Sequence, residues 1–142
     1  MFWQKQHDNP TGDSLAEQVG VAAEGFYRSG RMHCAEAVLM AVRNQFAAEV
    51  PEGVVRAAAG FGGGSGAGCL CGAVAGGTMA MGIVLGDDKR KIKQLTHDLH
   101  AWFKHEYSAT CCRVATQQAK GKGGCAVLTG KVAEKVADLL IA

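Results

Sequence analysis

Apolar residues recur at the spacing of an α-helix along most of the chain after residue 13. Residues 1–13 are largely polar and form an N-terminal lead-in that we expect to be flexible. Ser14 and Glu17 then have the spacing of a capping box, and Val19 and Ala23 continue at helical spacing. This pattern predicts a first helix that begins after the serine and ends at the next Ser-Gly pair.

The same periodicity predicts further helices, each bounded by a recognisable start or stop signal. A proline opens one segment, and one of two adjacent aspartates caps another. The expected helices cover about residues 33–46, 51–60, 70–85, 88–107, 110–120 and 125–140. We therefore expect six or seven helices, without alternating runs that would favour a sheet.

Half of residues 60–77, GFGGGSGAGCLCGAVAGG, are glycine, and no charged residue occurs between residues 70 and 85. A P-loop is excluded because no Lys-Ser or Lys-Thr pair follows the glycines, and a dinucleotide fingerprint needs a preceding strand. The apolar part spans only about 16 residues, short of the roughly 20 that cross a membrane. We expect a glycine-rich loop that leads into a buried central helix.

Composition supports one globular domain. The chain has 142 residues, 48% of them apolar, 20% charged, with a net charge of +2. This charge is too small to indicate nucleic-acid binding, and the first residues lack the layout of a signal peptide. We therefore predict a single-domain, all-α helical bundle over residues 14–142, located in the cytoplasm and not integral to a membrane. A homodimer is compatible with the sequence.

The six cysteines lie at predicted loop-to-helix junctions. None forms a C-x-x-C pair, so neither a thioredoxin motif nor a zinc ribbon is indicated. A helix N-terminus carries partial positive charge, which stabilises a thiolate. We therefore expect lowered thiol pKa values at these junctions. The cysteines are Cys34, Cys69, Cys71, Cys111, Cys112 and Cys125.

These segments resemble the putative redox-active protein family, which is named for the pattern C…GCAxxG…C…C. The similar stretches are CAEAVLMAV, the glycine-rich core with CGAVAG at residues 71–76, CCRVAT and CAVLTGKVAEKVADLL, and they span roughly residues 14–140. The resemblance implies that four cysteines form the site, with Cys112 chosen over Cys111 because Arg113 follows it. These site cysteines are Cys34, Cys71, Cys112 and Cys125.

Three functions remain open for these cysteines. In the first, they carry out thiol–disulfide or electron-transfer chemistry, with Cys71 as the thiolate and another site cysteine resolving it; an enzyme of this kind would be a thiol oxidoreductase. In the second, the same four cysteines bind zinc or an iron–sulfur cluster. In the third, the protein is a non-catalytic helical binding module. The first needs no cofactor, and its partner would be a redox protein or a small thiol.

Three histidines are weaker candidates. His97 and His100 lie three residues apart, a spacing that can chelate a metal, although a solvated helix face explains it more simply. His33 adjoins Cys34 at a predicted helix start. It is a candidate helix cap, a candidate base for Cys34, or an exposed residue.

Overall fold

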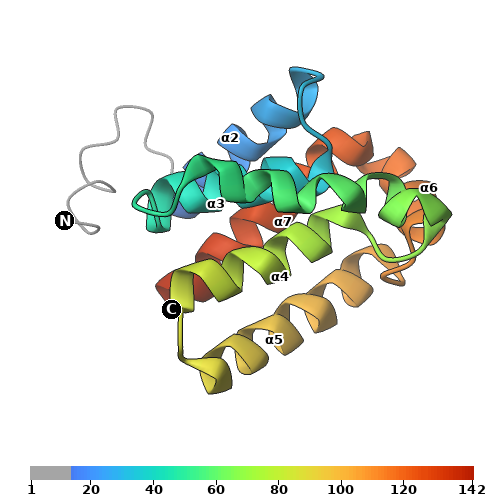
Figure 1. Cartoon of the computed structure of the whole chain (residues 1–142). Helices are drawn as coiled ribbons and strands as arrows, with labels where there is room; N and C mark the ends of the chain where they lie inside the picture. The colour runs from blue at the N-terminus through green and yellow to red at the C-terminus, as the bar shows by residue number, and fades with distance from the viewer. Residues whose placement is uncertain (1–13) are drawn as a thin grey trace.

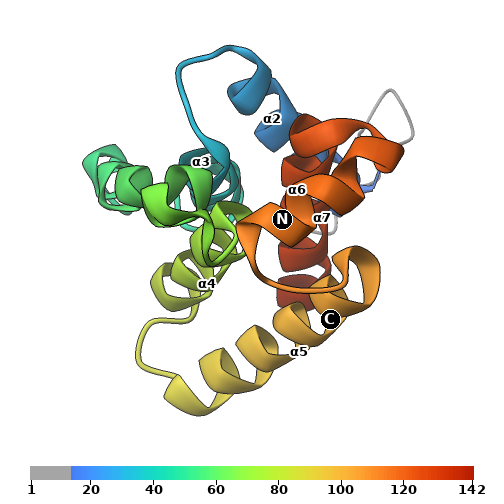
Figure 2. The same cartoon turned by 90° about the vertical axis from the view of Figure 1, so that its right-hand side faces the viewer.

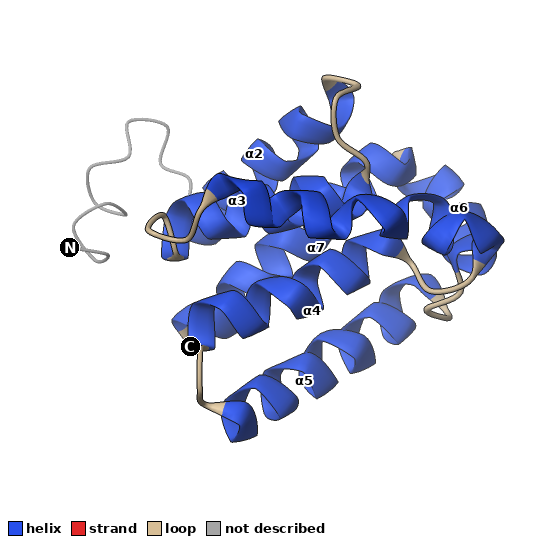
Figure 3. Cartoon of the chain, in the orientation of Figure 1, coloured by secondary structure: helices blue, strands red, loops and turns tan. Residues whose placement is uncertain are grey.

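The computed structural model of the protein describes residues 14–142, so the flexibility expected for residues 1–13 lies outside the described residues. Within the described part every regular element is helical and no strand occurs (Figure 3), which confirms the all-α prediction. The elements are α2 (Leu15–Arg28), α3 (Cys34–Phe46), η1 (Glu52–Phe61), η2 (Gly64–Gly68), α4 (Gly72–Leu85), α5 (Lys89–Tyr107), α6 (Cys112–Ala119), η3 (Lys120–Lys122) and α7 (Gly124–Ile141).

Two of the predicted helix starts are confirmed by their capping contacts. The Ser14 hydroxyl accepts a hydrogen bond from the Glu17 N–H at 3.1 Å, and the Glu17 carboxylate accepts one from the Ser14 N–H at 3.5 Å. The Asp88 carboxylate accepts a hydrogen bond from the Lys91 N–H at 3.1 Å. Both contacts satisfy N–H groups that have no partner within their own helix.

The glycine-rich segment is more ordered than a simple loop. The segment after Pro51 forms the tighter helix η1, and η2 is a single wide turn. Gly66 and Gly68 have φ values of 68° and 77°, a left-handed conformation that glycine adopts without steric cost. Leu70 also has a positive φ, of 60°. The high glycine content therefore allows the chain to turn repeatedly between η1 and α4.

The predicted buried helix is α4, although it shares the centre of the fold with α7. Residues 72–77 are all buried, whereas the second half of α4 is partly exposed at residues 82–85. Helix α7 contacts α2, α3, α4, α5 and α6, and one face of it is fully buried. The core is therefore built around two helices, and the apolar helix forms one of them.

Small residues allow these helices to pack closely. A Cβ atom added at Gly76 in α4 would collide with the backbone of Ala35 in α3. A Cβ atom added at Gly20 in α2 would lie 2.9 Å from the carbonyl oxygen of Gly130 in α7. Close packing of interiors leaves no space for an extra methyl group at such crossings.

Helices α3, α4 and α7 all begin at the same end of the molecule, the end where α6 lies (Figure 1). Figure 2 views the fold from this end, with α6 in front. The junctions that precede these helices are thereby brought together, although they are far apart in the sequence. None of the described helices is long and apolar enough to cross a membrane.

Candidate functional site

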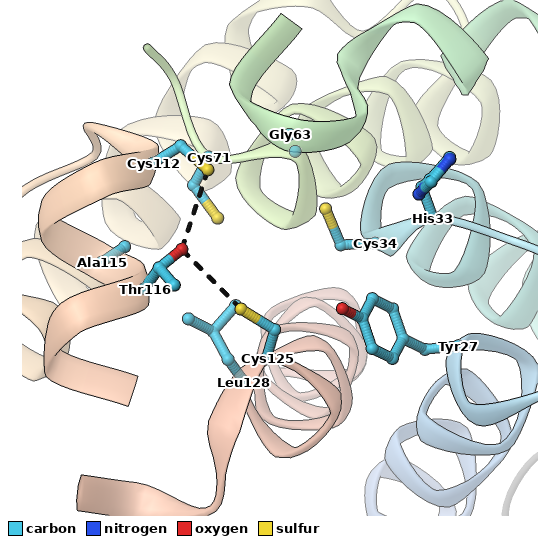
Figure 4. Close-up of a pocket in the computed structure, with 11 residues that line it drawn as sticks. Tyr27, His33, Cys34, Gly63, Cys71, Cys112, Ala115, Thr116, Cys125 and Leu128 are labelled. Carbon is cyan, nitrogen blue, oxygen red and sulfur yellow. Dashed lines mark hydrogen bonds between the residues drawn. The ribbon is translucent and has the colours of Figure 1, made fainter. Parts of the chain in front are cut away.

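One cavity of about 130 Å³ lies where these helix starts meet (Figure 4). Each of the four predicted site cysteines lines it from a different helix. One is the first residue of α3, one precedes α4 as its N-cap, one is the first residue of α6, and one is the second residue of α7. These cavity cysteines are Cys34, Cys71, Cys112 and Cys125. All six cysteines of the chain lie in the described part and have free thiols there.

The inner wall of the cavity brings Cys34 close to Cys71. A Cβ atom added at Gly72 would lie 2.5 Å from the Cys34 Sγ and 2.7 Å from the carbonyl oxygen of Phe61. The Cys34 sulfur therefore lies against the backbone at the start of α4, directly after Cys71. The glycine that follows the cysteine in the CGAVAG stretch is what allows this approach.

Cys112 and Cys125 both lie next to Thr116 in the cavity. The Thr116 Oγ1 lies 3.8 Å from the sulfur of Cys112 and 3.8 Å from the sulfur of Cys125, shown as dashed lines in Figure 4. The two sulfurs are therefore at most twice that distance apart. Thr116 was missed by the sequence analysis, although it follows Cys112 by four residues and so lies on the same face of α6.

The expected lowering of thiol pKa values is wrong for Cys71. Burial raises the pKa of its thiol from 9.0 to about 12, because the charged thiolate would lose its hydration. The backbone N–H groups of Val74 and Ala73 lower this pKa, as expected at a helix start, but their effect is smaller than that of burial. Only 5% of Cys71 is exposed, which explains why burial dominates.

At Cys34, burial and backbone hydrogen bonds also have opposite effects on the thiol pKa. Burial raises the pKa of its thiol, and the neighbouring sulfurs of Cys112 and Cys125 add to the increase as negative charges. The backbone N–H of Ala35 opposes these effects. Burial therefore disfavours the thiolate form of both Cys34 and Cys71.

Tyr27 is a further residue of the cavity that the sequence analysis missed. Its hydroxyl points into the space between Cys34 and Cys125 in Figure 4. Burial raises the pKa of this hydroxyl, and the sulfurs of Cys125, Cys34 and Cys112 raise it further. Tyr27 follows the buried Ala23 by four residues, so extension of the apolar stripe of α2 by one turn would have found it.

His33 is another of the residues that line the cavity. It is the N-cap residue of α3, and its backbone N–H donates a hydrogen bond to the Glu36 carboxylate at 3.1 Å. Its side chain is exposed and packs against Gly62, where an added Cβ would lie 2.8 Å from the Cγ of the ring. His33 was considered as a helix cap, as a base for Cys34 or as an exposed residue. The structure shows that it occupies the N-cap position and that it is exposed.

The remaining two cysteines, Cys69 and Cys111, do not line the cavity. Cys69 is exposed at the end of the η2 turn, and Cys111 is the partly buried N-cap residue of α6. The Cys111 thiol donates a hydrogen bond to the carbonyl oxygen of Gly68 at 3.3 Å. We call these two the rim cysteines.

No group of three or more His, Cys, Asp or Glu side chains within residues 14–142 is arranged to hold a metal ion. The zinc or iron–sulfur interpretation therefore has no preformed site in this part of the chain. His97 is highly exposed and lies 3.4 Å from the Asp98 carboxylate, while the Nδ1 of His100 contacts the Thr96 carbonyl oxygen at 2.8 Å. These contacts fit the interpretation of a solvated helix face for His97.

Comparison with known families matches most of the chain to a family model. The model of a family described as "Putative redox-active protein (C_GCAxxG_C_C)" matches residues 32–139. This range contains the whole of α3 to α6 and all six cysteines. No curated protein and no solved structure matches the chain.

Proposed function

Because the chain belongs to the putative redox-active protein family, we propose that it carries out thiol–disulfide exchange in the cavity described above. The observation that supports this most strongly is the meeting of four cysteine side chains, from four separate helices, at one small cavity. Free cysteines in a core usually act as small apolar residues. Four of them around one opening are more readily explained by shared chemistry.

We assign the exchanging pair to Cys112 and Cys125. Both are partly exposed, and the sulfurs of both contact the Thr116 hydroxyl at 3.8 Å. Modest movement at the starts of α6 and α7 would bring the two sulfurs to bonding distance. Cys71 is less suited to begin the reaction because its thiol is buried and its pKa is raised to about 12.

The reaction transfers two electrons between this pair and an external disulfide. One thiolate of the pair attacks the disulfide, forms a mixed disulfide and releases one external thiolate. The second cysteine of the pair then attacks the protein sulfur of the mixed disulfide and releases the other external thiolate. The protein pair is oxidised to a disulfide, and the two protons that it loses are taken up by the two released thiolates.

The other groups of the cavity have supporting roles in this proposal. The inner thiols of Cys34 and Cys71 remain protonated and keep the inner wall apolar. The Tyr27 hydroxyl also remains protonated, because its pKa is raised, and it can donate a hydrogen bond to a thiolate at Cys125. A reducing compartment such as the cytoplasm suits six free thiols.

Peptide mapping tests this assignment. The full chain is treated with oxidised glutathione, its remaining thiols are blocked, and it is digested with trypsin. We expect a disulfide between peptides 105–113 and 123–131, which contain Cys112 and Cys125. This link is expected to disappear in Cys125→Ser and to persist in Cys111→Ser, which removes the neighbouring thiol of the same peptide. Persistence of all cavity thiols under oxidation would refute the proposal.

A further inference from the structure

The rim cysteines lie where two distant segments run side by side. The Cys71 N–H donates a hydrogen bond to the Thr110 carbonyl oxygen at 2.6 Å, and the Cys111 thiol contacts the Gly68 carbonyl oxygen at 3.3 Å. The numbering rises along one segment as it falls along the other, so the two segments are antiparallel here. Cys69 lies between the two contacts, one peptide bond from the oxygen that Cys111 touches.

Further contacts hold the two segments together. An Arg113 guanidinium N–H donates to the Ala67 carbonyl oxygen at 3.3 Å. A Cβ atom added at Gly64 would lie 2.5 Å from the Cys112 Cβ and 2.8 Å from the Cys69 backbone nitrogen. The η2 turn is therefore packed directly on the first turn of α6, with the backbone of Cys69 close to the side chain of Cys112.

We propose that Cys69 and Cys111 form a second exchangeable dithiol, on the outside of the cavity, that reacts with small disulfides from solution. Cys69 is exposed and Cys111 is partly buried beside it. These properties suit a thiol that meets the external disulfide and a neighbouring thiol that resolves it. The Cys111 thiol gives up only a weak S–H···O contact when it turns toward Cys69.

The exchange is balanced in electrons and protons. The Cys69 thiolate attacks a small disulfide, forms a mixed disulfide and releases one small thiolate. The Cys111 thiolate then attacks the Cys69 sulfur and displaces the second small thiolate. The pair loses two electrons and two protons, and the small disulfide becomes two thiols.

Oxidation of the rim cysteines to a disulfide would also restrict movement of the helix starts that line the cavity. Cys69 lies two residues before Cys71, and Cys111 immediately precedes Cys112. A bond between the rim cysteines would therefore tie the start of α4 to the start of α6. This pair goes beyond the proposed function because it uses neither sulfur of the Cys112–Cys125 pair.

Peptide mapping of the full chain after treatment with oxidised glutathione tests the rim pair. We expect a link between tryptic peptides 57–89 and 105–113, each of which contains one rim cysteine and one cavity cysteine. The link is expected to be lost in Cys69→Ser and in Cys111→Ser. It is expected to remain in Cys71→Ser and Cys112→Ser, which change the other cysteine of each peptide.

A second readout does not depend on the folding of the variants. Fragmentation of the linked wild-type peptides on either side of Leu70 shows whether Cys69 or Cys71 carries the bond, and fragmentation between Cys111 and Cys112 assigns the other end. Absence of the link in the wild type, or its assignment to Cys71 or Cys112, would overturn the proposal. When both pairs are oxidised, peptide 105–113 joins peptides 57–89 and 123–131 in one species. Absence of either outer peptide from this species distinguishes failure of one pair from failure of the other.

Discussion

Gly72→Ala offers the sharpest test of how the inner wall is built. The added methyl group would lie 2.5 Å from the Cys34 Sγ and 2.7 Å from the carbonyl oxygen of Phe61. The second contact involves backbone, which cannot rotate away as a flexible side chain would. Gly72 is the first residue of α4 and does not have a positive φ, so the substitution introduces crowding without backbone strain.

Crowding of this kind in a packed interior costs about 1–3 kcal/mol. We therefore expect a lower free energy of unfolding by that amount, measured by urea denaturation followed by circular dichroism. We also expect faster alkylation of Cys34 in the native variant, because the methyl group pushes its sulfur away from the helix start. The alkylation measurement reports on the cavity itself, whereas unfolding reports on the whole fold.

Gly82→Ala is the matched control on the same helix. No atom lies within 4 Å of a Cβ added at this position, and the residue has no positive φ. Alanine favours the helix over glycine by up to about 1 kcal/mol, so this variant should be as stable as the wild type or more stable. The reasoning fails if Gly72→Ala is as stable as Gly82→Ala.

Three further predictions concern single groups. With a pKa of about 12 instead of 9.0, the thiol of Cys71 is ionised at pH 8 roughly a thousandfold less than an ordinary thiol. Iodoacetamide should therefore alkylate Cys71 far more slowly than the exposed Cys69. Comparable alkylation rates for the two cysteines would contradict the burial argument. Thr116→Val removes the hydroxyl that contacts the sulfurs of Cys112 and Cys125. It should change the ratio of oxidised to reduced glutathione at which their disulfide is half formed. An unchanged ratio would show that the hydroxyl has no part in the exchange. Asp88→Ala removes the cap of α5 and should cost about 1 kcal/mol in urea denaturation; a change within error would refute the capping role.

The positions of the helices follow closely from local signals in the sequence. Ser14 and Glu17 form the expected capping box, and Asp88 caps α5 as expected. These features depend on residues only three positions apart, so they can be predicted without knowledge of the tertiary fold. The detailed path of η2 could not be predicted, because its left-handed residues include Ser65 as well as glycines.

The role of the four cysteines as a functional site stays a prediction, and the expected sign of their electrostatics did not hold at Cys71. Cysteines at helix starts pointed to a shared role, and the structure places four of them around one cavity. The sign of the pKa shift at Cys71 was wrong because it depends on how deeply the helix start is buried, which is a tertiary property. The contribution of Tyr27 likewise depends on the placement of α2 beside the starts of α3 and α7.

The most direct test of the central proposal is a redox titration of the wild-type chain in glutathione buffers, with each sample quenched and mapped by mass spectrometry. The proposal predicts that the disulfide between Cys112 and Cys125 forms and breaks reversibly as the ratio of oxidised to reduced glutathione changes, while the protein stays folded. Formation of this bond only after unfolding in urea, or no bond at any ratio, would contradict the proposal.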